Sequence, residues 1–281
     1  MKKALIVVST DKPKAKELIR EIKAFLKEKS ISCFVYEYTG ITHSVNFEDS
    51  YDFAISLGGD GTVLFTARYC APKKISVFPV NLGHFGFIAN IEGKEWKKAL
   101  IKFLSGKEKL HERLLLSALV IRKNKEIGIF EALNDIVVSG AGIAKLINLE
   151  ISFNGIPFGT FRSDGVIVST PTGSTAYSAA SGGPILDPDV FAFVLTPISP
   201  FSLSNRPLVL SSSGKMIIKV LPMRTKDTIL SVDGQELFSL KEYDEIIITE
   251  SPNRVKMAGC SPDNFYKALQ SKLGWSGSSL N

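Results

Sequence analysis

The sequence predicts an α/β N-terminal part with a parallel, doubly wound sheet, then an all-β part, then a C-terminal helix that packs back. In the first 110 residues, short apolar runs alternate with amphipathic helical patterns, which is typical of parallel sheets. After about Leu110 the apolar runs lose helical spacing. Phe265, Leu269 and Leu273 return to the spacing of one helix face. We therefore expect domains at residues 1–110, 111–260 and 261–281.

The N-terminal part carries four predicted strands, at residues 4–8, 31–38, 53–57 and 75–80. Asp11 and Pro13 are helix-start signals before the first helical pattern, and a second pattern covers residues 96–104. Ligands of open parallel sheets bind beyond the carboxyl ends of the strands. Glycine-rich loops at Gly58 and Gly83 fall at such ends, so we expect both to face a ligand.

The second part consists of extended runs separated by turn signals. Asn154-Gly155 and Asp233-Gly234 are typical of hairpin turns. The predicted strands are residues 114–122, 128–138, 146–153, 166–169, 208–210, 216–221, 228–232 and 245–249. This pattern predicts a sandwich or a pair of stacked sheets.

Composition bounds the class of protein. The 281 residues carry a formal charge of +6, but no basic run with interleaved aromatic residues appears, so we expect no nucleic-acid partner. A mildly basic balance suits anionic small substrates. No apolar run approaches membrane-spanning length, so we expect no membrane partner and a cytoplasmic location. Three widely spaced cysteines indicate a reducing compartment, and no metal-ligand spacing of His or Cys is present.

The Gly58-Gly59-Asp60-Gly61 stretch lies where a predicted strand turns into a predicted helix. We expect its glycines to take positive φ and to let backbone N–H groups approach anionic oxygens. A carboxylate beside phosphate is repelled unless something compensates it. Asp60 would then accept a proton from a hydroxyl group or hold Mg²⁺ near phosphates. An ordinary glycine-rich turn, with Asp60 as a helix cap, stays open as the alternative.

Three later stretches are unusually polar for a sheet. Asn134 and Asp135 precede an apolar strand, where an amide and a carboxylate can bind paired hydroxyl groups, although a plain turn is an equal alternative. The hydroxyl-dense loop 172–178 includes Tyr177, whose ring could stack on a base. The sequence has no G-x-S-x-G motif and no histidine after position 111, which argues against a serine nucleophile. The turn at 232–236 could line a cleft, or be only a turn.

The order of motifs along the chain is distinctive. It runs from Gly58-Gly-Asp-Gly61 through Asn81-x-Gly83-x-x-Gly86-Phe87, Asn134-Asp135, Ser163-Asp-Gly165, Thr170-Pro-Thr-Gly-Ser-Thr-Ala-Tyr-Ser178 and Gly182-Gly-Pro184 to Asp233-Gly-Gln235. This order resembles the NAD kinases, and the tail from Phe265 to Trp275 is also similar to that family. The GGDG motif alone is shared with diacylglycerol, sphingosine and phosphofructo-kinases, whereas the long hydroxyl-rich loop is far more specific.

The resemblance implies that the γ-phosphoryl group of ATP is transferred to the 2′-hydroxyl of the adenosine ribose of NAD, giving NADP. Asp60 would take or polarise the hydroxyl proton, while Mg²⁺ and glycine-loop N–H groups stabilise the phosphate charge. Residues 111–260 would bind the dinucleotide, and Gly61 would lie against the ligand. The other implied binding residues are Asn134, Asp135, Lys145, Arg162, Asp164, Thr175, Ala176, Tyr177, Ser178, Ala179, Ala180 and Gln235.

Two positions depart from the family pattern. Many members carry Glu where Asp135 stands, and many carry a basic residue where this chain has Phe65. The expected partners are NAD, ATP and NADP, and apolar edge strands suggest a homo-oligomer, a dimer or a tetramer. Two other functions compete with this one: a lipid or sphingoid kinase that uses the same GGDG loop, and a non-catalytic NADP(H)-binding sensor.

Overall fold

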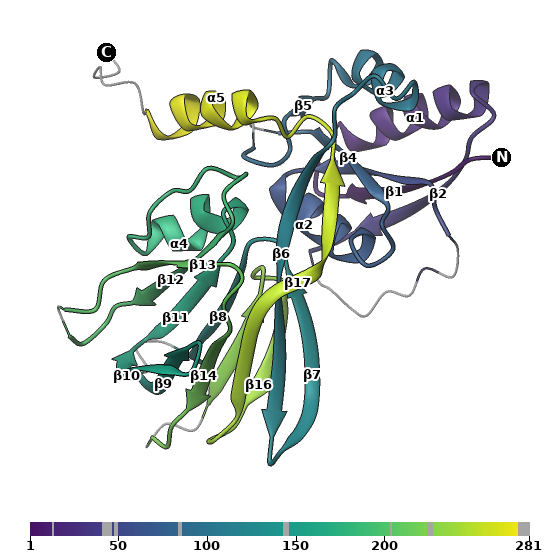
Figure 1. Cartoon of the computed structure of the whole chain (residues 1–281). Coiled ribbons are helices and arrows are strands. Elements are labelled where there is room, and N and C mark those ends of the chain that lie inside the picture. Colours follow the sequence, from purple (N-terminus) through teal and green to yellow (C-terminus); the bar gives the residue numbers. More distant parts are fainter. Residues whose placement is uncertain are drawn as a thin grey trace. The chain divides into compact units, whose positions relative to one another are not determined.

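The structure is a computed structural model that describes residues 1–12, 14–40, 47, 50–83, 86–142, 146–202, 204–223 and 227–274 (Figure 1). The chain divides into two compact units. Unit 1 comprises Met1–Arg113 and Asn253–Asn281, and unit 2 comprises Leu114–Pro252. The three-domain division at 110 and 260 stays a prediction.

Unit 1 is built on a parallel sheet of strands β1 (Lys3–Ser9), β2 (Ser32–Tyr38), β3 (Phe53–Gly58) and β4 (Ser76–Asn81). Their order is β4-β3-β1-β2, and each neighbouring pair is parallel. The short strand β5 (Ile91–Glu92) also pairs with β4 in parallel. The predicted parallel sheet is therefore confirmed. Every side chain of β3 is buried, because helices cover both faces of the sheet.

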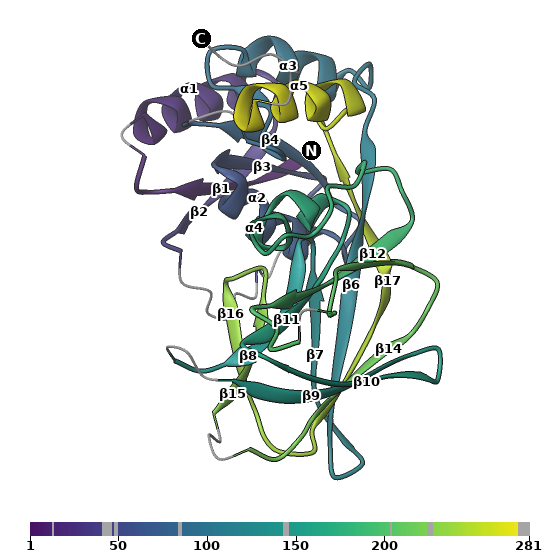
Figure 2. The same ribbon diagram turned by 90° about the vertical axis from the view of Figure 1, so that its left-hand side faces the viewer.

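Helices α1 (Ala15–Glu28) and α3 (Trp96–Leu104) lie on one face of this sheet, and α2 (Asp60–Cys70) lies on the other (Figures 1 and 2). Ile22 of α1 and Leu100 of α3 share a buried cluster with Ile6 and Ile55 of the strands. This is the doubly wound arrangement that the sequence predicts. Pro13, expected as a helix-start signal, lies outside the described residues.

Helix α5 (Pro262–Leu273) packs back on unit 1, as predicted. It begins after Ser261, whose hydroxyl oxygen accepts from the Asn264 N–H at 3.3 Å, and ends at Gly274 with φ of 61°. The ring of Phe265 lies 6.2 Å from that of Phe87. Among the described residues, no helix is both long and apolar enough to cross a membrane.

Unit 2 is β-rich, as predicted. One sheet has the order β13-β12-β11-β8-β15-β16, and all its pairs are antiparallel. These strands are β8 (Asp135–Gly140), β11 (Gly165–Ser169), β12 (Ala192–Ile198), β13 (Leu208–Ser211), β15 (Thr228–Val232) and β16 (Glu236–Leu240). Two short helices, η1 (Thr172–Thr175) and α4 (Tyr177–Ala180), follow β11.

The other strands of unit 2 pair in the order β10-β9-β14-β17, with β6 pairing with β17 and β7. They are β6 (His111–Arg122), β7 (Lys125–Ala132), β9 (Ile147–Phe153), β10 (Ile156–Ser163), β14 (Met216–Val220) and β17 (Glu245–Met257). Side chains from both groups of strands, including Val138, Val168, Ile151 and Ile218, form one buried core. The predicted stacked sheets are therefore present.

Three details differ from the predicted elements. The run 128–138 is not one strand, because β7 ends at Ala132 and β8 begins at Asp135. Strand β17 continues to Met257, well past the predicted end at residue 249. Strands β10, β12 and β16 were not among the predicted strands. Both hairpin turns are confirmed, since Asn154, Gly155, Asp233 and Gly234 all have positive φ.

Candidate functional site

The GGDG turn carries β3 directly into α2. Gly59 is the N-cap residue with φ of −112°, and Asp60 is the first helical residue. None of Gly58, Gly59 and Gly61 has positive φ, so that expectation was wrong. Space explains Gly58 instead, because a Cβ there would lie 2.2 Å from the Thr62 hydroxyl oxygen. At Gly59 a Cβ would meet no atom within 4 Å, so this backbone is open to an approaching ligand.

The Asp60 carboxylate accepts hydrogen bonds from three consecutive backbone N–H groups. Phe87 N lies 3.0 Å from Oδ2, and Ile88 N and Ala89 N lie 3.2 and 2.9 Å from Oδ1. No side-chain bond caps α2, so the helix-cap alternative for Asp60 does not hold. An ionised carboxylate has about four acceptor positions. Three are used here, which leaves room for one further donor on a partly buried side chain.

The second glycine-rich loop holds Asp60 in place. Its first residue, Asn81, stands opposite Gly58 in the parallel register of β3 and β4, so both loops leave the same end of the sheet. Asn81 Nδ2 donates to the Ala89 carbonyl at 2.9 Å. A Cβ on Gly86 would lie 2.0 Å from Asp60 Oδ1, so only glycine permits this approach. His84, considered with this loop, lies outside the described residues.

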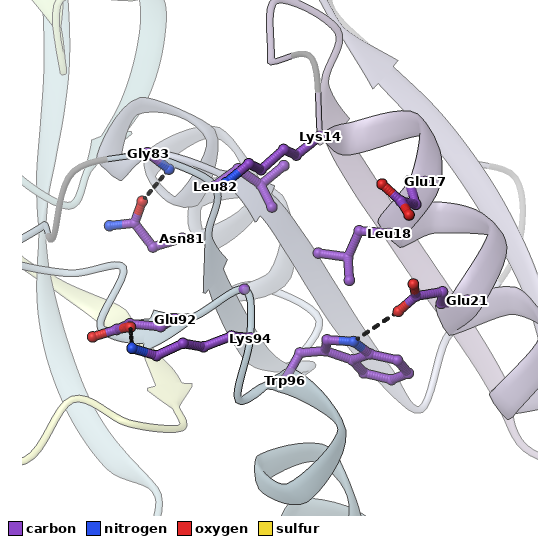
Figure 3. A pocket seen from close by; sticks show the side chains of 11 residues that line it. Lys14, Glu17, Leu18, Glu21, Asn81, Leu82, Gly83, Glu92, Lys94 and Trp96 are labelled. Atoms are coloured by element: carbon purple, nitrogen blue, oxygen red, sulfur yellow. Dashed lines mark hydrogen bonds and ion pairs between the residues drawn. The ribbon is translucent and has the colours of Figure 1, made fainter.

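A pocket of 740 Å³ opens beside this loop, within unit 1 (Figure 3). Lys94 forms an ion pair with Glu92 at 2.8 Å, and Trp96 Nε1 donates to Glu21 at 3.3 Å. Both signs of charge and an indole ring therefore line the pocket. None of the predicted site residues within the described ranges lines this pocket. The lining residues are Lys14, Glu17, Leu18, Glu21, Asn81, Leu82, Gly83, Glu92, Gly93, Lys94 and Trp96.

Unit 2 has its own pocket, of 420 Å³, which brings together four predicted residues: Asn134, Asp135, Ala176 and Tyr177. The Tyr177 side chain is 46% exposed, so its ring is free to stack on a planar ligand. Asn134 Oδ1 is buried and has no hydrogen-bond partner within the described part of the chain. A buried acceptor without a donor is costly, so a ligand N–H or O–H group would stabilise it. The other lining residues are Val137, Ser139, Ile229, Ser231, Asp233, Gly234 and Leu237.

Asp135 has an unusual charge state for a carboxyl group. Burial, and then the nearby Asp233 carboxylate, raise its pKa from 3.8 to about 7. Near neutral pH, Asp135 therefore holds a proton much of the time and can donate a hydrogen bond as well as accept one.

The remaining predicted binding residues that the structure describes do not line this pocket. Arg162 stacks on the Phe201 ring at 5.1 Å, and the buried Ser178 hydroxyl bonds to that of Thr196 at 2.9 Å. Thr175 Oγ1 donates to the Thr172 carbonyl at 3.3 Å. Asp164, at the turn from β10 to β11, is engaged through its backbone N–H and C=O groups. Elsewhere in unit 2 lie Ala179, Ala180 and Gln235, while Lys145 is outside the described residues.

Sequence reasoning missed three supporting positions. The turn at 232–236 was expected either to line a cleft or to be only a turn, and Asp233 does line the unit 2 pocket. That its carboxylate bonds to the backbone of residues 133–135 was not predicted. Gly86 was quoted in a motif but given no role. Gly173 packs so closely on Asn134 that a Cβ would lie 2.0 Å from its carbonyl oxygen. The Asp-Gly turn was the only local signal, because the partners of Asp233 lie about 100 residues away in the chain.

Phe65, the departure noted above, belongs to a cluster of aromatic side chains. Its ring stacks on Tyr36 at 5.4 Å and on Tyr38 at 4.8 Å. The side chain is buried. Phe65 therefore packs against β2 in this chain and does not neutralise phosphate.

Comparison with known proteins finds similarity to NAD kinases in both units of the chain. The family model of the ATP-NAD kinase N-terminal domain matches residues 43–108, and that of the C-terminal domain matches residues 133–259. An NAD kinase from Treponema denticola is 74% identical over 279 residues, covering 99% of this chain and 98% of that protein. An NAD kinase from Treponema pallidum, strain Nichols, is 50% identical and covers 98% of this chain and 90% of that protein.

Two solved structures resemble the fold. Yeast NADH kinase complexed with NADH has a TM-score of 0.88 at 26% identity and covers 100% of this chain and 89% of that one. An NAD kinase from Archaeoglobus fulgidus in complex with ATP has a TM-score of 0.74 at 25% identity, covering 94% and 96%.

Unit 1 has a carboxylate at a glycine-rich strand-to-helix turn, and unit 2 has a mainly apolar pocket with a few polar groups and a tyrosine ring. Both features fit the class of phosphotransferases that work on nucleotides. The chain belongs to the ATP-NAD kinase family.

Proposed function

We propose that Asp60 is the catalytic carboxylate in ATP-dependent phosphorylation of NAD, and that it engages the 2′-hydroxyl of the adenosine ribose. The observation that carries this role is the geometry of Asp60. Three N–H groups fix both carboxylate oxygens, and one acceptor position is left on a partly exposed side chain. A hydroxyl group of the acceptor sugar is the donor that this position suits.

The chemistry needs orientation more than strong basicity. Phosphoryl transfer passes through a loose transition state, and the attacking hydroxyl becomes acidic only late in the transfer. Asp60 would align the hydroxyl oxygen with the γ-phosphorus of ATP and take its proton as the new P–O bond forms. ADP leaves with the electron pair of the breaking P–O bond. The open backbone at Gly59, and Gly61 in the first turn of α2, would let phosphate oxygens approach the positive end of that helix.

Magnesium would enter with the donor as MgATP. Within the described residues, no three His, Cys, Asp or Glu side chains are grouped so that they could hold a metal ion. Mg²⁺ usually keeps several waters and binds through substrate phosphates with only one or two carboxylates, so such a group is not required. The cation would supply charge neutralisation at the transferring phosphate.

The pocket of unit 2 would bind the dinucleotide. Asn134 Oδ1 needs a donor, Asp135 can accept or donate, and Tyr177 offers a ring face. The amide and hydroxyl groups of NAD supply matching donors and acceptors, and its bases supply rings for stacking. We also keep Arg162, Asp164, Thr175, Ser178, Ala179, Ala180, Gln235 and Lys145 as proposed contacts or supports.

The exposed apolar edge of unit 2 supports the proposal of a homo-oligomer. Strand β13 is an edge strand, and its Leu208 and Val209 side chains are exposed, as is the neighbouring Phe191. An apolar edge of this kind favours pairing with a second copy. The three free thiols of Cys33, Cys70 and Cys260 fit the proposed cytoplasmic location.

The test is an assay of the purified protein with ATP, Mg²⁺ and NAD, scored for NADP. Asp60→Asn should lower kcat by about a thousandfold or more, because the amide cannot take the hydroxyl proton, while NAD binding changes less than about twofold. Asp52→Asn is the matched control, since Asp52 lies just before the same strand and its carboxylate accepts from the Lys3 N–H at 2.6 Å. Near-normal turnover of the Asp60 variant would remove Asp60 from the chemistry.

The same assay separates the competing functions. Wild-type protein that binds NADP without forming product would be a sensor. Protein that phosphorylates a lipid but not NAD would be a lipid kinase.

A further inference from the structure

The segment Leu133–Asp135, which joins β7 to β8, is held by one carboxylate. Asp233 Oδ2 accepts from Leu133 N at 3.1 Å. Asp233 Oδ1 accepts from Asn134 N at 2.7 Å and from Asp135 N at 3.1 Å. Three consecutive N–H groups therefore end on one side chain about 100 residues away in the sequence.

The carbonyl groups of the same segment are also bonded. Thr170 Oγ1 donates to the Leu133 carbonyl at 2.5 Å, and Thr170 N donates to the Asn134 carbonyl at 2.9 Å. Asp233 N donates to the Asp135 carbonyl at 2.9 Å. All six backbone polar groups of Leu133–Asp135 thus have partners, which fixes the segment in one conformation.

This segment places two of the ligand-facing side chains of the unit 2 pocket, Asn134 and Asp135. Both side chains are short, so their positions follow the backbone closely. Asp233 is itself buried, at 8% exposure, and its φ of 51° is one that Asp and Asn tolerate better than most residues. A fixed support of this kind orients binding groups without needing to touch the ligand.

We propose that Asp233 is a positioning residue for NAD binding, and that Thr170 supports it from the carbonyl side of the segment. The inference rests on the proposed assignment of the unit 2 pocket to the dinucleotide. Its experiment can fail while the Asp60 experiment succeeds, because the two concern different steps.

The charge of Asp233 gives a second, independent readout. Asp135 titrates near neutral pH partly because Asp233 repels its ionised form. Asp233 and Tyr177 are the other titratable groups that line the pocket within the described residues. Removing the Asp233 charge should therefore move the Asp135 titration to lower pH.

The main variant is Asp233→Asn, which keeps the shape and tolerates the same φ but has one acceptor oxygen instead of two. At least one N–H group of the segment then loses its partner. With saturating MgATP, we expect the KM for NAD to rise about tenfold while kcat stays within about twofold, since ground-state positioning is lost. The pH profile of kcat/KM for NAD should shift its inflection to lower pH.

Two matched controls separate positioning from general loosening of unit 2. Asp244→Asn removes another buried carboxylate, which bonds to Arg122 at 2.6 Å and to Lys241 N at 2.8 Å. Glu236→Gln removes an exposed carboxylate from the same turn as Asp233. Both should leave the KM for NAD and the pH profile at wild-type values, even if Asp244→Asn unfolds more easily.

A second positioning variant, Thr170→Val, removes the hydroxyl group that donates to the Leu133 carbonyl and accepts from the Gly173 N–H at 3.0 Å. It should raise the KM for NAD about threefold and leave the pH profile unchanged. If Asp233→Asn does not fold, this variant and its KM decide the question. An unchanged KM in the folded positioning variants would overturn the proposal, as would an equal rise in Asp244→Asn.

Discussion

Asp60 in unit 1 and Asp233 in unit 2 share one hydrogen-bond arrangement. Each carboxylate accepts three consecutive backbone N–H groups, from residues 87–89 and residues 133–135 respectively. The difference is access. Asp60 is partly exposed beside the open backbone of Gly59, whereas Asp233 is buried within a hairpin turn. In our two proposals, the same bonds therefore prepare Asp60 to meet a substrate, whereas in Asp233 they hold a chain segment in place.

Among the variants that follow, the largest effect is expected where the hydrogen bonds to the Asp60 carboxylate are disturbed. In Gly86→Ala the new Cβ would overlap Asp60 Oδ1 at 2.0 Å, so the carboxylate or the loop must move. We expect kcat to fall about a hundredfold, because a reacting group displaced by about 1 Å loses its alignment. Steady-state kinetics with ATP and NAD measures this.

The control for that variant is Gly214→Ala. Its Cβ would lie at the same short distance, 2.0 Å, from the Phe153 ring, which lines neither of the two pockets. This control should lose stability without losing kcat. If Gly86→Ala keeps wild-type kcat, or if both variants lose it equally, the geometry around Asp60 is not what supports turnover.

The next effect concerns stability and tests the raised pKa of Asp135 beside Asp233. Asp135 has a folded-state pKa of about 7 against an ordinary value of 3.8, so the folded protein binds this proton more tightly than the unfolded chain. Its contribution to stability is therefore complete below pH 3.8 and is lost as pH rises through 7. Asp135→Asn removes that loss. The unfolding free energy of wild type should fall between pH 5 and pH 8, and that of Asp135→Asn should not fall in this way. We therefore expect the difference between the variant and wild type to change by a few kcal/mol in favour of the variant over this range.

Urea unfolding at the two pH values measures this difference. Asp189→Asn, in an exposed turn, is the comparison and should follow wild type at both. A stability difference between Asp135→Asn and wild type that is the same at pH 5 and pH 8 would contradict the raised pKa.

The smallest effect tests the departure at Phe65. Phe65→Leu should lower the unfolding free energy by about 1 kcal/mol, since it removes the stacking on Tyr36 and Tyr38 but keeps an apolar side chain. Chemical denaturation measures this loss, and kcat should not change. A fall in kcat at unchanged stability would instead show that the packing of Phe65 against β2 supports turnover.

Much of the fold was predictable because its signals are local. The apolar runs of β1, β3 and β4 and the one-sided pattern of α1 are set by spacing along the chain. The break between β7 and β8 was not, because the apolar run continues through Leu133. The interruption comes from Asp233, which takes the N–H groups that a continuous strand would give to a neighbour.

Part of the candidate site was predictable for a related reason. Asn134, Asp135, Ala176 and Tyr177 meet in one pocket, and each stands in a polar motif that interrupts an apolar pattern. The positive φ expected of the GGDG glycines was wrong. The sequence shows that the GGDG turn has glycines, which lack Cβ atoms. It does not show whether glycine is needed there for a positive φ or because a Cβ would clash with neighbouring atoms.

By itself, the sequence determined the alternation of elements, the glycine turn with its acidic residue, and the order of motifs that the family shares. Only the tertiary structure decided what holds each carboxylate and whether a ligand can reach it. The physical reason is that hydrogen-bond partners and solvent access depend on segments far apart in the chain, as with Asp60 and residue 89, or Asp233 and residue 133. The spacing of residues within one segment does not indicate these distant partners or the solvent access.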